Sequence, residues 1–215
     1  MYMKAIYRLA REGPGATTSV LATELGVSPA SVSGMLKKLV ADGYVEHEAR
    51  GDIALTRKGL QEAVRVVRRN RLAERMLTDM LGMSWDDVHA EACILEHAIT
   101  DRLEEALIKT LGDPKTCPHG HPIPPRDLSR PEPLGEPLAQ VEPGDDATVC
   151  GVTEALPEML RYLGELGMQP GAHVRVIEKA PLGGPVTIEI GNKRVAVSLE
   201  LARMVLVTRQ AAVIR

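Results

Sequence analysis

The sequence predicts a mainly α-helical protein with a small share of β-structure, in which a helical front part precedes a module of short strands. Apolar residues recur at helical spacing over residues 1–112. Eight prolines then fall within residues 113–142, where regular elements are not expected. Strand-like apolar runs between Gly and Pro turns fill the remainder. We therefore expect four segments, at residues 1–60, 61–125, 126–142 and 143–215.

The composition is that of a globular chain with room for more than one domain. Of its 215 residues, 44% are hydrophobic and 26% are charged, which argues against disordered and collagen-like classes. No run approaches the about 20 apolar residues that a membrane span needs, and the start lacks a signal-peptide core. With no Phe and one Trp, base stacking on single-stranded nucleic acid is not expected.

The thiol content predicts a reduced compartment. Cys93, Cys117 and Cys150 form neither a disulfide framework nor a Cys-x-x-Cys pair. Cys150 lies in an apolar run, where a core position is expected. We expect a cytoplasmic protein.

The first segment is typical of a helix-turn-helix. A helical pattern over residues 1–12 stops at a Gly-Pro-Gly sequence, and a second short helix ends at Gly26. Ser28 followed by Pro29 opens a third helix, which ends before Gly43. Three helices with a tight middle turn form this motif.

Two alternating runs follow the third helix, at residues 44–48 and 52–56, and predict a hairpin of the kind called a wing. A long Arg- and Leu-rich helix should then run to Gly82, with a break near Asn70.

The middle segment predicts two more helices. Ser84 with Asp87 resembles a capping box that opens a helix through His97. Thr100 opens another helix, which ends at Gly112.

The C-terminal segment predicts a small barrel. One helix is expected at residues 158–166. Five short strands are expected in addition, which suggests a closed sheet: residues 148–152, 174–178, 186–190, 194–197 and 205–208.

The charge is unevenly distributed. Residues 1–75 carry a net charge of +5, and the remainder carries −8, within an overall charge of −3. A basic module in an acidic chain is typical of nucleic-acid binding, although solvation of an exposed face would produce the same excess.

Ligand-type side chains gather on one predicted helix face. His89, Cys93, Glu96 and His97 share that face, at spacings of four, seven and eight residues. The alternative is a half-buried helix with a hydrogen-bonded His and a structural Cys. Possible partners are Asn70 with Glu74 on the preceding helix, and the thioether of Met1.

Cys117, His119 and His121 also have a metal-like spacing. Because they lie in the proline-rich stretch, we expect a connecting strap there instead. His47 and His173 are expected to be ordinary surface residues.

Several motifs occur in a specific order: residues 70–75 (Asn-Arg-Leu-Ala-Glu-Arg), 88–93 (Val-His-Ala-Glu-Ala-Cys), 96–97 (Glu-His), 118–124 (Pro-His-Gly-His-Pro-Ile-Pro), 164–171 and 181–185. Over nearly the whole chain they resemble the iron-dependent regulators related to the diphtheria toxin repressor, with the manganese regulators as cousins. The resemblance implies an N-terminal winged helix-turn-helix, a helical dimerisation domain, a proline-rich linker and a C-terminal SH3-like domain of the iron-transport accessory (FeoA) type.

The resemblance also implies two metal sites. The activating site would use Met1, Cys93, Glu96 and His97, and the ancillary site would use Asn70, Glu74, His89 and Glu154. The chain departs from its relatives at two ancillary positions, since the family has His where this chain has Asn70 and Gln where it has Pro157. We therefore expect one tightly held ion per subunit and a weak or empty ancillary site.

Nine residues are candidates for DNA contact. The start of the third helix would face base edges through Ser28, Ala30, Ser31 and Gly34. These small side chains predict modest direct readout and a dependence on DNA shape. Phosphate contacts are expected from Lys37, Lys38, Arg50, Arg57 and Lys58.

Together these features predict a homodimeric repressor of metal-homeostasis genes that binds double-stranded operator DNA, with Fe(2+) or Mn(2+) as corepressor. Thioether and thiolate donors favour iron(II), and a manganese-responsive regulator is the alternative. A metal-independent winged-helix regulator or a metalloenzyme is a further alternative. No His-Glu-x-x-His, nucleophile elbow or phosphate loop supports an enzyme.

Overall fold

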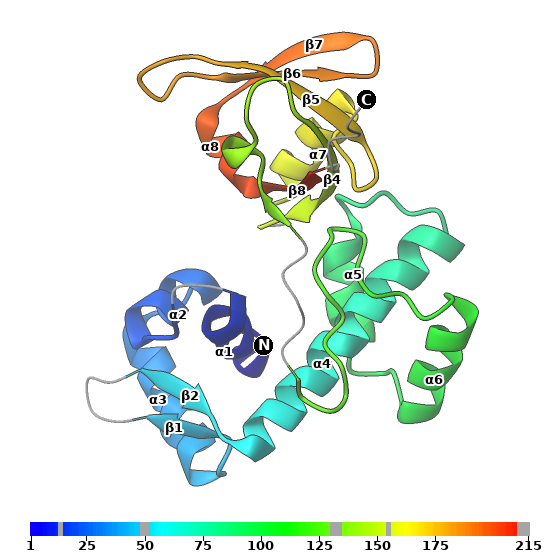
Figure 1. Cartoon of the computed structure of the whole chain (residues 1–215). Helices are drawn as coiled ribbons and strands as arrows, with labels where there is room; N and C mark the ends of the chain where they lie inside the picture. The colour runs from blue at the N-terminus through cyan, green and yellow to red at the C-terminus, as the bar shows by residue number, and fades with distance from the viewer. Residues whose placement is uncertain (13–14, 48–51, 130–134, 154–155, 210–215) are drawn as a thin grey trace. The chain divides into compact units, whose positions relative to one another are not determined.

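The computed structural model describes residues 1–12, 15–47, 52–129, 135–153 and 156–209. The chain forms two compact units. The first unit comprises residues 1–70 and 124–131, and the second comprises residues 71–123 and 132–215 (Figure 1).

The first unit contains the predicted helix-turn-helix. Its helices are α1 (Tyr2–Glu12), α2 (Thr18–Leu25) and α3 (Pro29–Ala41). The side chain of Thr17 caps α2 by accepting from the Val20 N–H, and Gly26 ends it in the left-handed conformation at φ 63°. The predicted end of this helix at Gly26 is therefore confirmed.

A short antiparallel hairpin follows, formed by β1 (Val45–His47) and β2 (Ile53–Leu55). It packs on the helices through a small apolar core that includes Ile6, Leu21 and Leu36. The predicted hairpin tip, with Arg50, lies outside the described residues.

Helix α4 (Arg57–Arg75) begins in the first unit and continues into the second. The predicted break near Asn70 is wrong, because the helix is continuous to Arg75 and a π-helical turn at Met76–Met80 follows it. No Gly or Pro lies between Leu60 and Leu81, so nothing in this stretch forces a break at Asn70.

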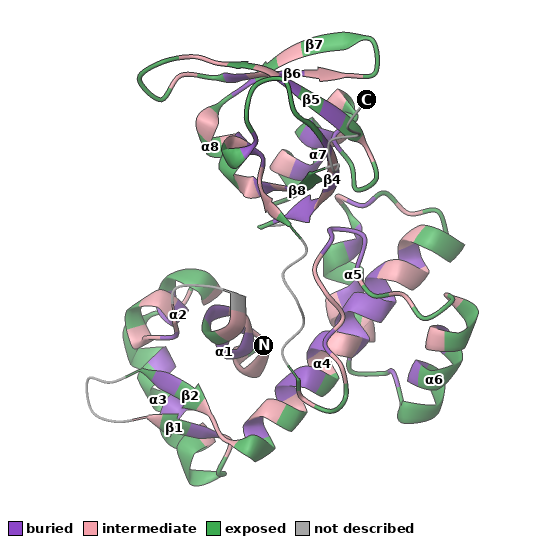
Figure 2. Cartoon of the chain, in the orientation of Figure 1, coloured by how far each residue is buried: buried purple, intermediate pink, exposed green. Residues whose placement is uncertain are grey.

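The second unit opens with a helical part made of the end of α4, α5 (Val88–Leu95) and α6 (Asp101–Thr110). They share an apolar core: Leu72, Ala73, Leu77, Val88, Ala92, Ile99 and Leu107. The expected helix from Ser84 through His97 is shorter at both ends. Helix α5 begins only at Val88, with no side-chain cap from Asp87, and it ends at Leu95, after which a turn leads directly to Thr100, which caps α6. Figure 2 shows the buried residues along α4.

The proline-rich stretch is more ordered than expected. An isolated bridge joins Thr116 to Pro122. A short strand β3 (Glu136–Pro137) and a 3₁₀ turn (Leu138–Gln140) occupy part of the predicted linker.

The C-terminal part of the second unit is a small antiparallel sheet. Its described strands pair in the order β3-β8-β4-β5-β6-β7. The strands after β3 are β4 (Asp146–Val152), β5 (His173–Lys179), β6 (Val186–Ile190), β7 (Lys193–Val197) and β8 (Val205–Arg209). The five predicted strands are confirmed to within about two residues at each end.

Two helices complete this part. The predicted helix is present as α7 (Pro157–Leu166), whereas the short α8 (Leu199–Met204) was not predicted. Both contribute to the core under the sheet, which also buries Trp85 from the helical part. No helix among the described residues is long and apolar enough to cross a membrane.

Candidate functional site

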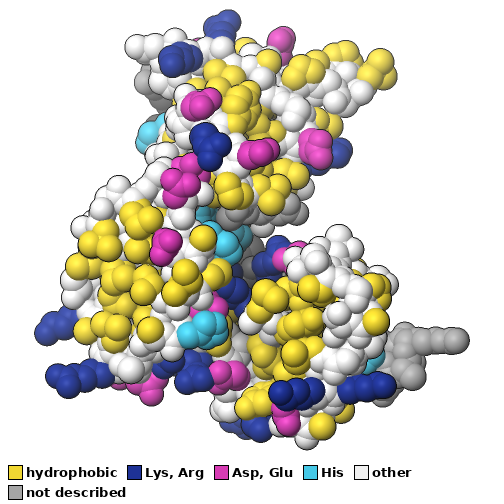
Figure 3. Space-filling view, turned by 180° about the vertical axis from the view of Figure 1, so that it is seen from behind, with side chains coloured by type: hydrophobic (Ala, Val, Ile, Leu, Met, Phe, Trp, Pro, Cys, Tyr) yellow, Lys and Arg dark blue, Asp and Glu magenta, His cyan; other side chains and the backbone are white. Residues whose placement is uncertain are grey.

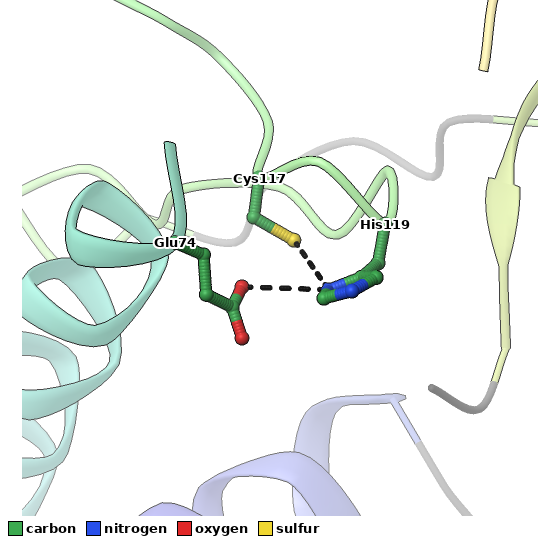
Figure 4. A group of neighbouring side chains, drawn as sticks. All are labelled: Glu74, Cys117 and His119. Carbon is green, nitrogen blue, oxygen red and sulfur yellow. Dashed lines mark hydrogen bonds and ion pairs between the residues drawn. The ribbon is translucent and has the colours of Figure 1, made fainter. Parts of the chain in front are cut away.

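The structure brings one group of metal-ligand side chains together inside the second unit. Glu74 lies near the end of α4, and Cys117 and His119 lie on the loop that follows α6 (Figure 4). One carboxylate oxygen, the Cys117 sulfur and one His119 ring nitrogen all lie within 4.8 Å of one another, and all three residues are buried. We call these three residues the buried cluster.

The loop that carries Cys117 and His119 is tied to α4 through its main chain. Arg75 donates from Nε to the Thr116 carbonyl at 2.8 Å and from a terminal nitrogen to Thr116 Oγ1 at 3.3 Å. Arg71 donates to the Pro122 carbonyl. These contacts, with the Thr116–Pro122 bridge, close the loop against the helix that supplies Glu74.

The loop is also joined to strand β4. The Val152 N–H donates to the His119 carbonyl at 3.0 Å. Gly120 has φ +86°, and a Cβ there would lie 2.2 Å from the Cys150 carbonyl oxygen. Only glycine fits this conformation and this close approach.

A backbone carbonyl orients the His119 ring. Its Nε2 lies 2.6 Å from the Trp85 carbonyl, which can only accept, so Nε2 carries the proton. The Nδ1 atom therefore faces Glu74 Oε2 at 3.5 Å and Cys117 Sγ at 3.8 Å. The ring also stacks on Trp85, with a centroid distance of 5.9 Å. A fixed ring of this kind is typical of metal-binding histidines.

The second oxygen of Glu74 has a different partner. Oε1 lies 3.0 Å from His89 Nδ1, and His89 Nε2 lies 3.6 Å from Cys93 Sγ. The carboxylate therefore lies between two imidazoles, with one on each oxygen.

The ionisation of these groups reflects their close packing. Burial opposes the charged form of Glu74, but hydrogen bonds with His119 and His89 outweigh it and hold its pKa well below the usual range. Burial likewise opposes protonation of His119, yet Cys117 and Glu74 raise its pKa to about 10. Hydrogen bonds with Cys93 and Glu74 raise the pKa of His89 to about 9, and burial raises the pKa of the Cys117 thiol.

The residues of the predicted activating site are divided between the two units, with Met1 in the first and Cys93, Glu96 and His97 in the second. Cys93 is on α5, and the buried Glu96 and the exposed His97 follow it in the turn, with His97 Nε2 3.5 Å from Glu96 Oε1. Among the described residues, these three do not form a group with all ligand atoms within 4.8 Å. Met1 belongs to the first unit, so the joint site stays a prediction.

The predicted ancillary residues are also only partly brought together. Glu74 contacts His89, as noted, and Asn70 lies one turn earlier on α4. Glu154 lies outside the described residues, and Pro157 is the first residue of α7.

Sequence reasoning missed the role of the loop. Its Cys-x-His spacing was the available signal, and the proline content led us to favour a strap. The third residue of that pattern, His121, contributes a backbone carbonyl to the Cys117 N–H at 2.9 Å, and its side chain is not part of the buried cluster.

The candidate DNA-binding helix α3 exposes most of the predicted residues. Ala30, Ser31 and Gly34 are exposed. Ser28 caps the helix by accepting from the Ser31 N–H at 3.1 Å, and the two hydroxyl oxygens lie 2.9 Å apart. The Ser28 hydroxyl oxygen is therefore already engaged as the hydrogen-bond acceptor that caps α3.

The predicted phosphate-contacting residues differ in their surroundings. Lys37, Lys38 and Arg57 are exposed on the first unit, where Figure 3 shows Lys and Arg side chains along the lower edge. Lys58 donates to the Asp42 carbonyl at 2.9 Å and lies 4.2 Å from the centroid of the Tyr44 ring.

Comparison with family models matches nearly the whole chain in three parts. Residues 1–53 match the N-terminal DNA-binding domain of iron-dependent repressors, and residues 56–125 match their metal-binding and dimerisation domain. Residues 136–209 match the FeoA domain.

Individual proteins match as well. The iron-dependent repressor IdeR of Mycobacterium tuberculosis is 34% identical over 97% of this chain and 96% of its own length. The diphtheria toxin repressor of Corynebacterium diphtheriae is 38% identical over 58% of this chain and 55% of its own length. A solved manganese-dependent transcriptional repressor in complex with manganese is 34% identical and has a TM-score of 0.87, covering 97% of this chain and 98% of that one.

Proposed function

Since the chain belongs to the family of iron-dependent repressors, we propose that its buried cluster holds one of the divalent ions to which it responds. Members of this family are metal-responsive, DNA-binding transcriptional repressors and are not enzymes. The fold class expected from the sequence is confirmed by the same comparisons.

The donor chemistry of the buried cluster fits a divalent transition metal. With metal–sulfur and metal–nitrogen distances of about 2.3 and 2.0–2.1 Å, a tetrahedral ion separates its sulfur and nitrogen donors by about 3.6 Å. The corresponding nitrogen–oxygen separation is about 3.4 Å. The observed separations are 3.8 Å from Cys117 Sγ to His119 Nδ1 and 3.5 Å from His119 Nδ1 to Glu74 Oε2. Small side-chain adjustments would bring all three donors onto one ion.

This arrangement depends on neither of the two positions at which the chain departs from its relatives. Cys117 and His119 come from the loop, so Asn70 and Pro157 do not need to act as ligands. We therefore revise the expectation from the sequence and propose two ions per subunit. The buried cluster holds one, and the predicted activating site of Met1, Cys93, Glu96 and His97 holds the other.

We propose iron(II) as the physiological ion in preference to manganese(II). A thiolate and an imidazole are softer than the carboxylate and water ligands typical of manganese, and the Irving–Williams order points in the same direction. Both metals are represented by name among the relatives.

Metal supplies a positive charge that draws ligands from separate parts of the chain together. Ligation by Met1 on the first helix and by Cys93, Glu96 and His97 in the helical part would favour one arrangement of the DNA-binding unit. In a homodimer, that arrangement would set two recognition helices about 34 Å apart, at successive major grooves. We place this activity in the cytoplasm, where operator DNA is accessible.

The operator contacts are proposed from α3 and its surroundings. Ala30, Ser31 and Gly34 would lie against base edges, while Lys37, Lys38 and Arg57 would contact phosphates. Their exposure supports this assignment.

The observation that supports this proposal is the close approach of the ligand atoms of Glu74, Cys117 and His119. Substitution of Cys117 tests it. Cys117→Ser should remove one of two thiolate-to-cobalt charge-transfer absorptions and lower the bound cobalt(II) by about one ion per subunit, measured by anaerobic equilibrium dialysis. It should also raise the iron(II) concentration for half-maximal operator binding more than about tenfold, because direct ligands matter at least as much as the groups that orient them.

His121→Ala is the matched control, because it alters a side chain of the same loop that lies outside the buried cluster. It should leave the cobalt count and the operator response unchanged. An unaltered cobalt spectrum in Cys117→Ser would refute the buried cluster as a metal site.

A further inference from the structure

One apolar cluster joins α1 to α4 within the first unit. It consists of Tyr7 from α1 and of three residues from α4, all of them buried: Ala63, Val64 and Val67. We call these four residues the α1–α4 cluster. Other residues of α1 pack into the core of the helix-turn-helix, namely Ala5, Ile6 and Leu9. Helix α1 therefore packs against α4 and the helix-turn-helix at once, so a change in its position would reach the recognition helix α3.

A segment from much later in the chain approaches this cluster. Residues 122–129, which we call the strap, continue directly from the loop that supplies two residues of the buried cluster. Arg71 donates to the Pro122 carbonyl, and Arg68 donates to the Pro124 carbonyl. The two arginines are three residues apart, which places them on one face of α4. The strap is therefore held along α4 by main-chain contacts as it leaves the loop.

The strap meets the α1–α4 cluster at Leu128. The Leu128 side chain packs against the cluster. Its carbonyl accepts a hydrogen bond at 3.5 Å from the guanidinium of Arg11, in the last turn of α1. The same guanidinium lies 5.8 Å from the centroid of the Tyr7 ring. Leu128 thus contacts α1 through both its side chain and its main chain.

The backbone conformation of Leu128 points to a role for its side chain. Its φ is +68°, a left-handed conformation that residues with a Cβ rarely adopt and that glycine adopts readily. Such a conformation persists only where the surroundings fix it, and it is common in switch and binding segments. Glycine would suit this turn better, and the contact that only leucine provides is the packing against the α1–α4 cluster.

We propose that Leu128 is a positioning residue, which sets α1 against α4 and makes that setting depend on the loop of the buried cluster. An ion that binds Cys117 and His119 would fix the start of the strap, and Leu128 would pass this restraint on to α1. Operator binding requires one arrangement of the DNA-binding helices, so an ion that favours the same arrangement raises operator affinity. This inference rests on the proposed function, because it assumes an ion in the buried cluster.

Leu128→Gly tests the role of the side chain, because glycine suits the left-handed backbone and the substitution removes only the packing. Operator affinity is measured by fluorescence anisotropy with and without iron(II), under anaerobic conditions. The ratio of the two affinities should fall at least about fivefold, which is the lower end of typical coupling between sites. A purely structural role would lower both affinities together and leave their ratio unchanged.

Two further measurements locate the effect. The cobalt(II) bound per subunit should be unchanged, because Leu128 is not part of the buried cluster. Hydrogen–deuterium exchange of the iron-loaded variant should be faster over the amides of α1, whereas exchange over α6, in the second unit, should stay as it was. Leu182→Gly is the matched control and should change none of these measurements, because Leu182 also has a left-handed backbone, at φ +58°, but is fully exposed.

An unchanged affinity ratio in Leu128→Gly would overturn the proposal, and so would unchanged exchange over α1. Loss of bound cobalt would overturn it as well, because Leu128 would then act on the loop rather than on α1. An unmodified protein without the cobalt absorption of Cys117 would refute the buried cluster instead. In that case the affinity ratio and the exchange over α1 would still decide whether Leu128 positions this helix.

Discussion

Gly120 offers a quantitative test of how the loop that carries Cys117 and His119 is held. Its φ of +86° is a left-handed conformation that costs a residue with a Cβ about 1–2 kcal/mol. In Gly120→Ala the new Cβ would also lie 2.2 Å from the Cys150 carbonyl oxygen and 2.4 Å from the Gly151 Cα. Both are backbone atoms, so the loop or strand β4 must move.

The cost of that movement can be estimated from the contacts involved. Overpacking typically costs about 1–3 kcal/mol. Losing the hydrogen bond from Val152 N–H to the His119 carbonyl adds about 1 kcal/mol. Gly120→Ala should therefore lower the free energy of unfolding by about 3–6 kcal/mol.

Gly144→Ala is the matched control. Gly144 has φ +94°, and within the described part of the chain no atom lies within 4 Å of the place that a Cβ would take. Gly144→Ala should therefore lower the free energy of unfolding only by the cost of the left-handed backbone, about 1–2 kcal/mol. With a urea dependence of about 2 kcal/mol per molar, the unfolding midpoints of the two variants should differ by about 1–2 M.

The assay is urea unfolding of the metal-free protein, followed by fluorescence. Trp85 is the only tryptophan of the chain and stacks on His119, so its emission reports on this region. Because Gly120 adjoins His119, Gly120→Ala should also lose cobalt binding at the buried cluster, whereas Gly144→Ala should retain it. Equal midpoints for the two variants would refute the claim that the loop is packed tightly against β4.

Two further predictions concern DNA and protons. Lys37→Ala should weaken binding to all DNA sequences and reduce the slope of log affinity against log salt by about one, as the loss of one phosphate contact requires. Fluorescence anisotropy at several salt concentrations measures this slope, and an unchanged slope would contradict a phosphate contact by Lys37. Ion uptake should release at least one proton, since the pKa of His119 is raised to about 10 and its Nδ1 must be deprotonated to bind metal. Cobalt affinity should therefore increase as pH rises from about 6 toward 9. The His119 contribution to the stability of the metal-free fold has the opposite sign, being complete below pH 6.5 and lost as pH approaches 10. Calorimetry in buffers of different ionisation enthalpy counts the released protons, and uptake without release would contradict the assignment of His119.

The sequence predicted the elements well where local patterns dominate. The strands from β4 to β8 were placed to within a few residues because their apolar runs are bounded by Gly and Pro. Ser28 and Thr100 were correctly identified as caps, since capping depends on residues three positions apart. The six-residue helix α8 was missed because one and a half turns leave too short a pattern.

The buried cluster was harder to predict because it depends on contacts between residues that are distant in the sequence. Glu74 and Cys117 lie more than forty residues apart, and no spacing rule connects a helix with a loop across that distance. The chain returns to α4 because Arg71 and Arg75 bind carbonyl groups of the loop. Such side-chain-to-backbone contacts leave no periodic trace in a sequence.

These arginine contacts have a consequence for how such a repressor evolves. The loop is anchored by the carbonyl groups of Thr116 and Pro122, which every amino acid provides. These two anchoring contacts therefore do not use the side chains at positions 117 and 119. Exchange of those side chains would remove the His119 contacts with the Trp85 ring and carbonyl but would leave both main-chain anchors in place. The donor set of the buried cluster can thus vary while the loop stays attached to α4.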